Sequence, residues 1–546
     1  MGKISLGPAS STEPRPEDVI GRVESHEFVD DVYDRRVLTS TSGQRDAFDD
    51  HDGEDLPKGW FSWRKLWLFT GPGFLMSIAY LDPGNLESQL QAGAQAGYDL
   101  MWVLLWVIIM GYLMQILAVK LGVATGTNMA QQCRKVYPTV PRYVLWIMME
   151  IAIIGSDIQE VVGSAIAITL LTYGAVPLWA GVIITAVASF VLLLLERLGV
   201  RWLEALFAVF IGLMAVAFGV MYVLAGVPTA RVLEGLVIPR LPRPALQMAV
   251  AIVGAGIMPA NFYLHSALVH SRKIDTNQIA RKKEAIGYYR IESAIALFCA
   301  LLINIFVVSV FARGFYGKGD VDIGLENAGA YLGDTFGPLM RVIWAVGLLA
   351  AGQSSTITGV YTGQFVMSGF LDMQISQWQR IGITRSVALV PTLLVSLLYR
   401  QPGGTELDTL NEWLNVLQSM QIPFALLPLL MLTSSEAIMG RAFKNTLLTN
   451  IAAWLIAAAV LAINGFLLFD FVAKDLPTNA AARIGFLACV AVYLLLVIYF
   501  ALGPQRVSAM QRRIDHWRGR QKEDRELDRE SLLHQSSQEQ PANGQV

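Results

Sequence analysis

Runs of about 20 apolar residues recur along the chain, and they constrain its fold more than any other feature. A helix rises about 1.5 Å per residue, so each run can cross the roughly 30 Å hydrocarbon core of a bilayer. Of the 546 residues, 54% are hydrophobic and only 16% are charged, with a mean hydropathy of +0.47. A soluble protein of this length would carry more charge. The sequence therefore predicts an all-α polytopic membrane protein.

About twelve apolar segments are predicted to form transmembrane helices. Helices are expected because backbone groups inside a bilayer must find hydrogen-bond partners within their own segment. The segments lie near residues 66–94, 99–123, 142–172, 178–195, 203–226, 246–270, 286–312, 337–368, 384–399, 408–432, 448–470 and 481–502.

Polar tails flank these segments. Residues 1–57 contain 14 acidic and 6 basic residues together with many Ser, Pro and Gly, a composition that predicts a disordered acidic tail. The transmembrane domain is expected to cover residues 58–502, and a second tail residues 503–546. Basic residues gather in alternate loops, such as 134–142 and 272–283, which places both termini in the cytoplasm. The loop 227–245, predicted to lie outside, also holds three arginines and is the exception.

Two of the segments carry helix-breaking residues in their middle. The first reads "DPGN", with Pro83 and Gly84 after Asp82, and the sixth reads "MPAN", with Pro259 after Met258. Each proline is followed two positions later by an asparagine. The two segments are five apart, which predicts inverted repeats over about 63–228 and 245–433, followed by helices 11 and 12. Paired discontinuous helices mark the substrate site in transporters of this kind.

The residues at these breaks are suited to bind a metal ion. Asp82 offers a charged oxygen, Asn85 a neutral oxygen, Met258 a sulfur, and Ala255 a backbone carbonyl freed by the break. Oxygen ligands with one sulfur favour a borderline-soft ion such as Mn²⁺ or Fe²⁺ over Ca²⁺ or Mg²⁺. An intramembrane carboxylate is costly and is usually functional. For Met258 the alternative is that it only fills a gap in the core.

Three long motifs resemble the natural resistance-associated macrophage protein (Nramp) family of proton-coupled divalent-metal transporters. They are "DPGNLESQLQAGAQAGY", "MPANFYLHSALVHSRK" and "AGQSSTITGVYTGQFVMSGFL". The resemblance runs from about residue 64 to 500. It implies a twelve-helix version of the five-plus-five inverted-repeat (LeuT-like) architecture, with discontinuous helices 1 and 6. The Gly- and Ser-rich start of the third motif is interpreted as packing scaffold.

The resemblance also implies roles for particular residues. The family's metal ligands match Asp82, Asn85, Met258 and the Ala255 carbonyl, and a glutamine of helix ten matches Gln418. Its proton route matches residues on helices three, six and nine, and Asp82 itself can carry a proton; the further residues are Asp157, Glu160, His265 and Arg385. Asp157 and Glu160 are three residues apart and so share one helix face. Either carboxylate can alternatively belong to a structural ion pair, and His265 can be a packed histidine.

One position departs from the family pattern. The residue after the helix-six proline is usually histidine, and here it is Ala260. Because histidine is the side chain most easily protonated near neutral pH, its loss can alter or loosen proton coupling.

The resulting hypothesis is import of Mn²⁺, Fe²⁺ and Cd²⁺-like ions by alternating access with proton symport. Alternatives are a weakly coupled or uncoupled metal transporter, a non-transporting metal sensor on the same scaffold, and a Na⁺-coupled carrier of an organic solute. An enzyme is not expected, because no nucleophile–base pair, phosphate loop or zinc motif is found, and no cofactor is predicted.

The expected partners are divalent metal ions, protons and the lipid bilayer. A net charge of −2 gives no reason to expect nucleic acid. The C-terminal tail contains "DRESLL", with Asp528, Leu532 and Leu533, a pattern read by endosomal sorting adaptors that also occurs by chance in charged tails. The plasma membrane and an endosomal or vacuolar membrane both fit the sequence.

Overall fold

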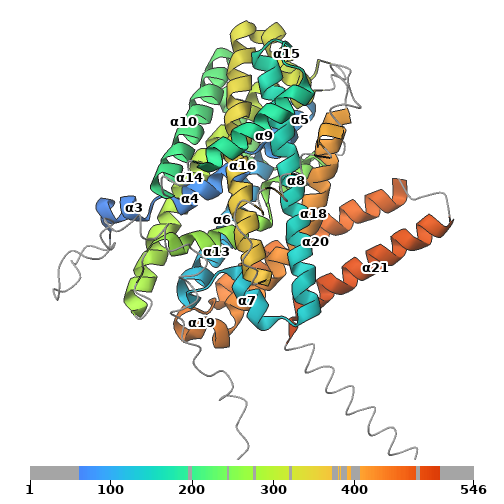
Figure 1. The fold of residues 1–546 in the computed structure, drawn as a ribbon. Helices are drawn as coiled ribbons and strands as arrows, with labels where there is room; N and C mark the ends of the chain where they lie inside the picture. The colour runs from blue at the N-terminus through green and yellow to red at the C-terminus, as the bar shows by residue number, and fades with distance from the viewer. Residues whose placement is uncertain are drawn as a thin grey trace, which may run out of the picture. The chain divides into compact units, whose positions relative to one another are not determined.

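The chain is helical throughout the part that the computed structural model describes, and every regular element there is a helix (Figure 1). The described residues all belong to one unit, residues 46–546. They are 61–194, 200–242, 245–272, 274, 278–318, 323–371, 379, 382, 386, 390, 392–394, 406–474 and 480–504.

The first half of the chain supplies ten of the elements that matter below. They are α3 (Trp63–Phe69), α4 (Pro72–Ser77), the 3₁₀ turn η1 (Ile78–Tyr80), α5 (Pro83–Ala96), α6 (Met101–Thr125), α7 (Met129–Val136), α8 (Thr139–Leu171), α9 (Leu178–Leu194), α10 (Val200–Leu224) and α11 (Thr229–Val237).

The second half repeats this pattern. Its elements are α12 (Leu246–Gly256), α13 (Ala260–Leu268), η4 (Val269–Ser271), α14 (Ile279–Phe315), α15 (Leu325–Phe336), α16 (Pro338–Leu371), α18 (Glu406–Ser434), α19 (Glu436–Phe443), α20 (Leu447–Lys474) and α21 (Ala480–Leu502).

Nine described segments are long and apolar enough to span a membrane, and all nine match predicted ones. The other three predicted segments account for the difference from twelve. The first is divided among α4, η1 and α5, and the fourth is α9, whose described apolar stretch, Leu178–Ala188, is shorter. The ninth, near 384–399, lies mostly outside the described residues, as does Arg385.

Helix packing follows the predicted inverted repeat. α5 of segment one packs on α14 of segment seven, and α13 of segment six packs on α6 of segment two. A shift by five segments exchanges these two pairs. The same shift exchanges the α10–α16 pair with the α18–α8 pair, and it maps the extensive α8–α16 contact onto itself. The predicted five-plus-five architecture is therefore confirmed.

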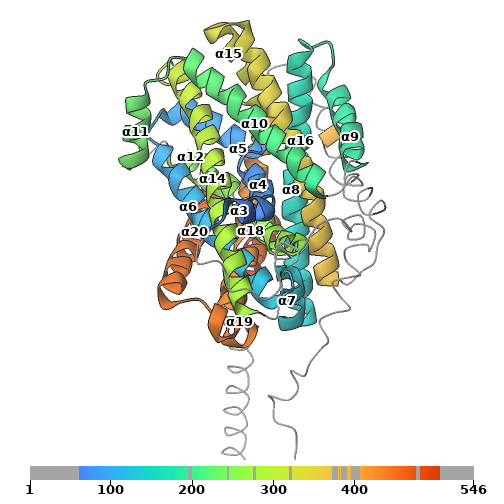
Figure 2. The ribbon, with the colours of Figure 1, turned by 90° about the vertical axis from the view of Figure 1, so that its left-hand side faces the viewer.

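The short helices between the spans gather at two ends. α11 and α15 lie at one end, and α7 and α19 at the other (Figures 1 and 2). This matches the alternation of loops expected from the sequence. α7 begins at a capping box, in which the Asn128 side chain accepts from Gln131 N at 2.9 Å and the Gln131 side chain accepts from Asn128 N at 3.0 Å.

One arginine of the exceptional loop 227–245 is paired with acids. Arg240 lies 2.6 Å from Glu234 Oε1 and 3.7 Å from Asp99 Oδ1. Arg240 therefore connects this loop to Asp99, at the start of the second segment.

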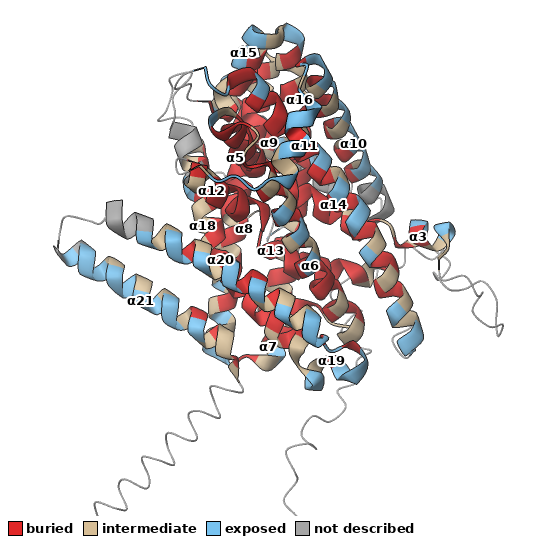
Figure 3. Cartoon of the chain, turned by 180° about the vertical axis from the view of Figure 1, so that it is seen from behind, coloured by how far each residue is buried: buried red, intermediate tan, exposed pale blue. Residues whose placement is uncertain are grey.

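Burial differs between the centre of the molecule and its last two helices. Figure 3 shows buried residues concentrated around α5, α8 and α13, while α20 and α21 are largely exposed. Buried polar side chains are also frequent on α5, α8, α16 and α18, which include the helices that carry the first break and the acidic pair.

Candidate metal-binding site

The first break lies between η1 and α5. Asp82 has an extended backbone and caps α5, because its Oδ1 accepts a hydrogen bond from Asn85 N at 2.7 Å. Pro83 occupies the first helical position, where no N–H is needed. The proline also deprives the carbonyl four residues earlier, that of Ala79, of its usual helical donor.

The second break repeats this logic between α12 and α13. Ile257 leaves the helical conformation with φ −108° and ψ 75°, and α13 restarts at Ala260. Pro259 has no N–H, so the carbonyl four residues earlier, that of Ala255, loses its usual helical donor. Met258 lies in the turn itself and is 6% exposed.

Asn85 joins the two breaks. Its Nδ2 donates to Ala79 O at 3.2 Å, to Ala255 O at 3.0 Å and to Asp82 Oδ1 at 3.0 Å. The two carbonyls freed by the two prolines therefore meet at one side chain. Asp82, Asn85 and Ala255 are all at most 4% exposed. The structure thus brings together three of the predicted ligands and places Met258 three residues from Ala255.

At this point of the structure, hydrogen-bond acceptors outnumber the hydrogens available to them. An amide NH₂ has two hydrogens, and here three acceptors, one of them a carboxylate oxygen, lie within hydrogen-bond distance of it. The backbone N and the Nδ2 of Asn85 both donate to Oδ1 of Asp82, so Oδ2 takes no part in capping. A cation would satisfy these oxygens better than the amide does. Sequence reasoning missed Ala79, although its offset from Pro83 equals that of Ala255 from Pro259.

Two residues that were not predicted from the sequence, Gln159 and Asn415, connect Gln418 and its helix to α5. The Nε2 of Gln418 donates to Gln159 Oε1 at 2.7 Å. Gln159 lies on α8 directly over the first turn of α5, since a Cβ on Gly84 would fall 2.6 Å from Gln159 Oε1. Asn415, one turn before Gln418, donates to Ser88 Oγ of α5 at 3.0 Å. The sequence signal that could have identified Gln159 and Asn415 is the presence of amide side chains within apolar segments.

The acidic pair of α8 faces one point on α16. A Cβ on Gly359 would fall 2.7 Å from Asp157 Oδ1 and 3.6 Å from Glu160 Oε2. Both carboxylates therefore occupy one helix face, as predicted, and the missing side chain at Gly359 makes room for them. Ser156 Oγ donates to Glu160 Oε1 at 3.0 Å.

The helix-six residues complete the predicted set. Ala260 is the first residue of α13, and His265 lies within that helix, fully buried. Neither ring nitrogen of His265 has a hydrogen-bond partner within the described part of the chain.

The site differs from acid-rich metal sites. No group of three His, Cys, Asp or Glu residues able to hold a metal occurs among the described residues. Among the predicted ligands Asp82 alone carries a charge, and the others are neutral oxygens and the Met258 sulfur.

Comparison with known proteins gives a consistent picture. The family profile described as natural resistance-associated macrophage protein-like matches residues 73–470. The chain is 51% identical over 468 residues to metal transporter Nramp4 of Arabidopsis thaliana, covering 85% of this chain and 90% of that protein. It is 57% identical over 420 residues to metal transporter Nramp3 of the same plant, covering 76% and 82%.

A solved structure is similar along most of the chain. A mutant of the manganese transporter from Eremococcus coleocola matches with a TM-score of 0.74 and 30% identity. The match covers 85% of this chain and 99% of that one.

Proposed function

The chain belongs to the natural resistance-associated macrophage protein-like (Nramp) family, and from this membership we propose that it is a secondary active transporter of divalent transition-metal ions. It is an integral membrane protein of a metal-transporter family, and it would move Mn²⁺, Fe²⁺ and Cd²⁺-like ions into the cytoplasm by alternating access. The observation that carries the proposal is the meeting of Ala79 O, Ala255 O and Asp82 at Asn85.

Metal binding would exchange the contacts of Asn85. In the structure the Nδ2 of Asn85 faces the three oxygens. A ligand to a cation must present oxygen, so the amide would rotate and offer Oδ1. The ion then takes the place of the two amide hydrogens. Met258 adds a sulfur that favours transition metals over Mg²⁺ and Ca²⁺.

Proton symport would use the carboxylates. An entering cation disfavours a proton on Asp82 by charge repulsion. We propose that the released proton passes along α8 through Asp157 and Glu160, with His265 and Arg385 assisting. The replacement of the family histidine by Ala260 favours a second candidate, a weakly coupled or uncoupled metal transporter. The metal-sensor reading has no specific support.

The wider context stays a proposal as well. Both termini would be cytoplasmic, with residues 1–57 and 503–546 as tails and 58–502 as the transporter. The membrane would be the plasma membrane or an endosomal or vacuolar one. The proposed sorting residues Asp528, Leu532 and Leu533 lie outside the described residues.

Reconstitution tests the function. Mn²⁺ uptake into proteoliposomes is followed together with luminal pH for wild type and Asp82→Ala, with Cys489→Ala on the exposed side of α21 as reconstitution control. We expect uptake with luminal acidification in wild type and the control, and neither in Asp82→Ala. Uptake without acidification would favour the uncoupled transporter. No wild-type uptake from folded protein would contradict metal transport.

A further inference from the structure

A chain of buried side-chain amides connects α8, α18 and α5 beside the candidate site. Gln159 on α8 donates from Nε2 to Asn415 Oδ1 at 2.8 Å and to Asn411 O at 3.1 Å, and its Oε1 accepts from Gln418 Nε2 at 2.7 Å. Asn415 Nδ2 in turn donates to Ser88 Oγ at 3.0 Å and approaches Gly84 O at 3.4 Å. The five residues with side chains in this group are each at most 3% exposed; they are Ser88, Gln159, Asn411, Asn415 and Gln418.

The direction of every hydrogen bond in this chain is fixed by its ends. A carbonyl oxygen can only accept, so the end of the Gln159 amide that lies 3.1 Å from Asn411 O must be its NH₂ group. The Asn411 carbonyl therefore holds Gln159 with Nε2 toward α18. On α5, Ser88 Oγ donates to Gly84 O at 3.2 Å and accepts from Asn415 Nδ2, which leaves Oδ1 of Asn415 for Gln159. Reversing any one amide would place two acceptors or two donors against each other.

The fixed direction of these hydrogen bonds determines which end of the Gln418 amide bonds to Gln159. Because Gln159 turns its Oε1 to Gln418, only the NH₂ end of Gln418 can bond to it. The oxygen of Gln418 is thereby excluded from this contact. An amide binds a cation through oxygen and never through its NH₂ group. A glutamine without such a partner would present either end.

We infer that Gln159 is a positioning residue that orients the amide of Gln418 so that its oxygen is the end offered to a divalent cation. The inference deepens the proposed function and rests on it. Gly84 is required for this geometry, since any side chain there would collide with the Gln159 amide. Gln159 therefore links the ligand on α18 to the first turn of α5, two residues after Asp82.

A double-mutant cycle tests the inference, with Mn²⁺ affinity of the purified full chain in nanodiscs measured by calorimetry. Gln159→Leu is compared in two backgrounds, one with Gln418 and one with Gln418→Glu. A carboxylate has oxygen at both ends and needs no orientation. We expect Gln159→Leu to weaken Mn²⁺ binding about tenfold with Gln418, as for other outer ligand partners. With Gln418→Glu the same change leaves binding unchanged or tighter.

Two further variants make the result decisive. Gln159→Met, which keeps the side-chain length, should weaken binding like Gln159→Leu and covers the case in which leucine does not fold. Gln353→Leu is the matched control, because Gln353 is a buried glutamine of α16 that donates to Ser164 on the same helix α8 at 3.1 Å. It should leave Mn²⁺ affinity within about twofold of wild type, which is no more than a neutral buried substitution outside the site causes.

The possible outcomes separate the claims. An equal loss in both backgrounds, or no loss with Gln418 in folded protein, would overturn the positioning role while leaving the proposed function intact. If wild type itself bound no Mn²⁺, the proposed function and the inference would fall together. Only a loss of Mn²⁺ affinity that occurs with Gln418 and not with Gln418→Glu supports the proposal that Gln159 orients Gln418.

Discussion

At the scale of single residues, the hydrogen-bond donors and acceptors at the two breaks are unequal in number. Asn85 supplies two hydrogens to three oxygens, and the two carbonyls among them have lost their helical donors to Pro83 and Pro259. The protein tolerates this because the amide and the carboxylate remain close. The same imbalance favours a divalent cation, which several oxygens can share at once.

Met258 is expected to set the selectivity of the site. Met258→Ala removes the only sulfur at the breaks and leaves Asp82 and the neutral oxygens, a set that hard ions accept. We predict that this variant retains Mn²⁺ uptake but becomes sensitive to Ca²⁺ or Mg²⁺, with at least a tenfold gain in competition, or about 1.4 kcal/mol. Competition of Mn²⁺ uptake by Ca²⁺ measures it. Unchanged competition would assign Met258 to packing alone.

Some site residues could be predicted from sequence and others could not. The paired "DPGN" and "MPAN" motifs predict Asp82, Asn85 and Met258 as ligands, because a charge and a proline in an apolar run are rare. Ala79 was missed because an alanine carries no chemical signal in its side chain. Gln159 was missed because its role depends on which helices face it, and that depends on tertiary packing.

At the scale of elements, the first turn of α5 is set by close contact with α8. A Cβ on Gly163 of α8 would overlap Pro83, falling 2.6 Å from its Cγ. Gly163 therefore lets the broken helix approach the scaffold helix that carries Asp157, Gln159 and Glu160.

Gly163→Ala is expected to displace this turn. An added methyl in a close-packed contact costs about 1–3 kcal/mol, so we predict a lower unfolding temperature and weaker Mn²⁺ binding. The control is Gly212→Ala on α10, where an added Cβ meets nothing within 4 Å and the helix should gain up to about 1 kcal/mol. Thermal unfolding of both variants in nanodiscs measures the difference. Similar melting temperatures for the two would contradict this account of the contact.

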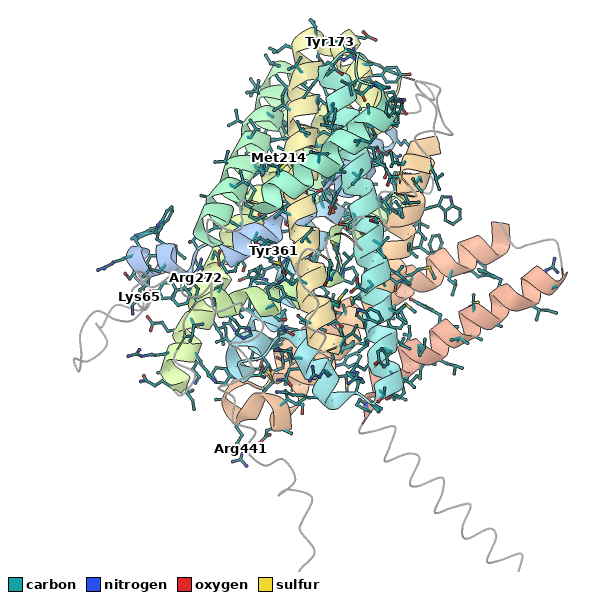
Figure 4. All side chains as sticks on the ribbon, viewed as in Figure 1. Lys65, Tyr173, Met214, Arg272, Tyr361 and Arg441 are labelled. Carbon is teal, nitrogen blue, oxygen red and sulfur yellow. The ribbon has the colours of Figure 1, made fainter. Side chains whose placement is uncertain are left out.

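The segment that leads into the first break is held by helix seven and by the end of helix six. Arg272, 6% exposed, donates to Leu68 O and to Thr70 O, both at 2.9 Å. Glu292 of α14 accepts from Gly71 N at 2.5 Å and from Gly73 N at 2.9 Å. Figure 4 shows Arg272 and Lys65 close together on the left of the molecule, between the ends marked by Tyr173 and Arg441.

Glu292→Gln is expected to loosen this segment. Hydrogen bonds to a charged group contribute about 1.5–3 kcal/mol, so losing the charge should speed amide hydrogen exchange in residues 63–77 about tenfold. Glu284→Gln is the control, because Glu284 pairs with Lys65 at 2.6 Å on a half-exposed surface and should contribute less than about 1 kcal/mol. Equal exchange in both variants would show that Glu292 does not hold the segment.

Element positions were predicted better than element breaks. The run near 99–123 became α6, Met101–Thr125, with ends shifted by two residues. The run near 66–94 was predicted to be interrupted, but its division into α4, η1 and α5 depends on the caps made by Asp82 and Glu292. The short helices α7, α11, α15 and α19 were not predicted, since apolar run length carries no information about them.

At the scale of the whole molecule, the inverted repeat explains why both breaks meet. Segments one and six occupy equivalent places, so each broken helix packs on the equivalent partner, α14 for α5 and α6 for α13. The freed carbonyls of Ala79 and Ala255 are then brought to the same centre. Two halves that enclose one site can rock about it and expose it to each side in turn.

The N-terminal tail is expected to be dispensable for this process. Deletion of residues 1–57 should leave the rate of Mn²⁺ uptake within about twofold, because a polar, acidic tail does not contribute to a packed core. A longer deletion, through Gly71, is the contrasting variant. It removes Lys65, the carbonyls that bind Arg272 and one of the amides that bind Glu292, so uptake should fall strongly. A strong loss with the short deletion would assign the tail a role in transport.

The central claim is that the two helix breaks together bind the transported metal, and anomalous X-ray scattering from crystals grown with Mn²⁺ tests it most directly. The account predicts one strong manganese peak between the breaks, in contact with Asp82, Ala255 O and the rotated Oδ1 of Asn85, and close to Met258. Crystals of Asp82→Ala should lack that peak. A peak elsewhere, or an Asn85 that still donates to Ala255 O beside bound manganese, would contradict the account.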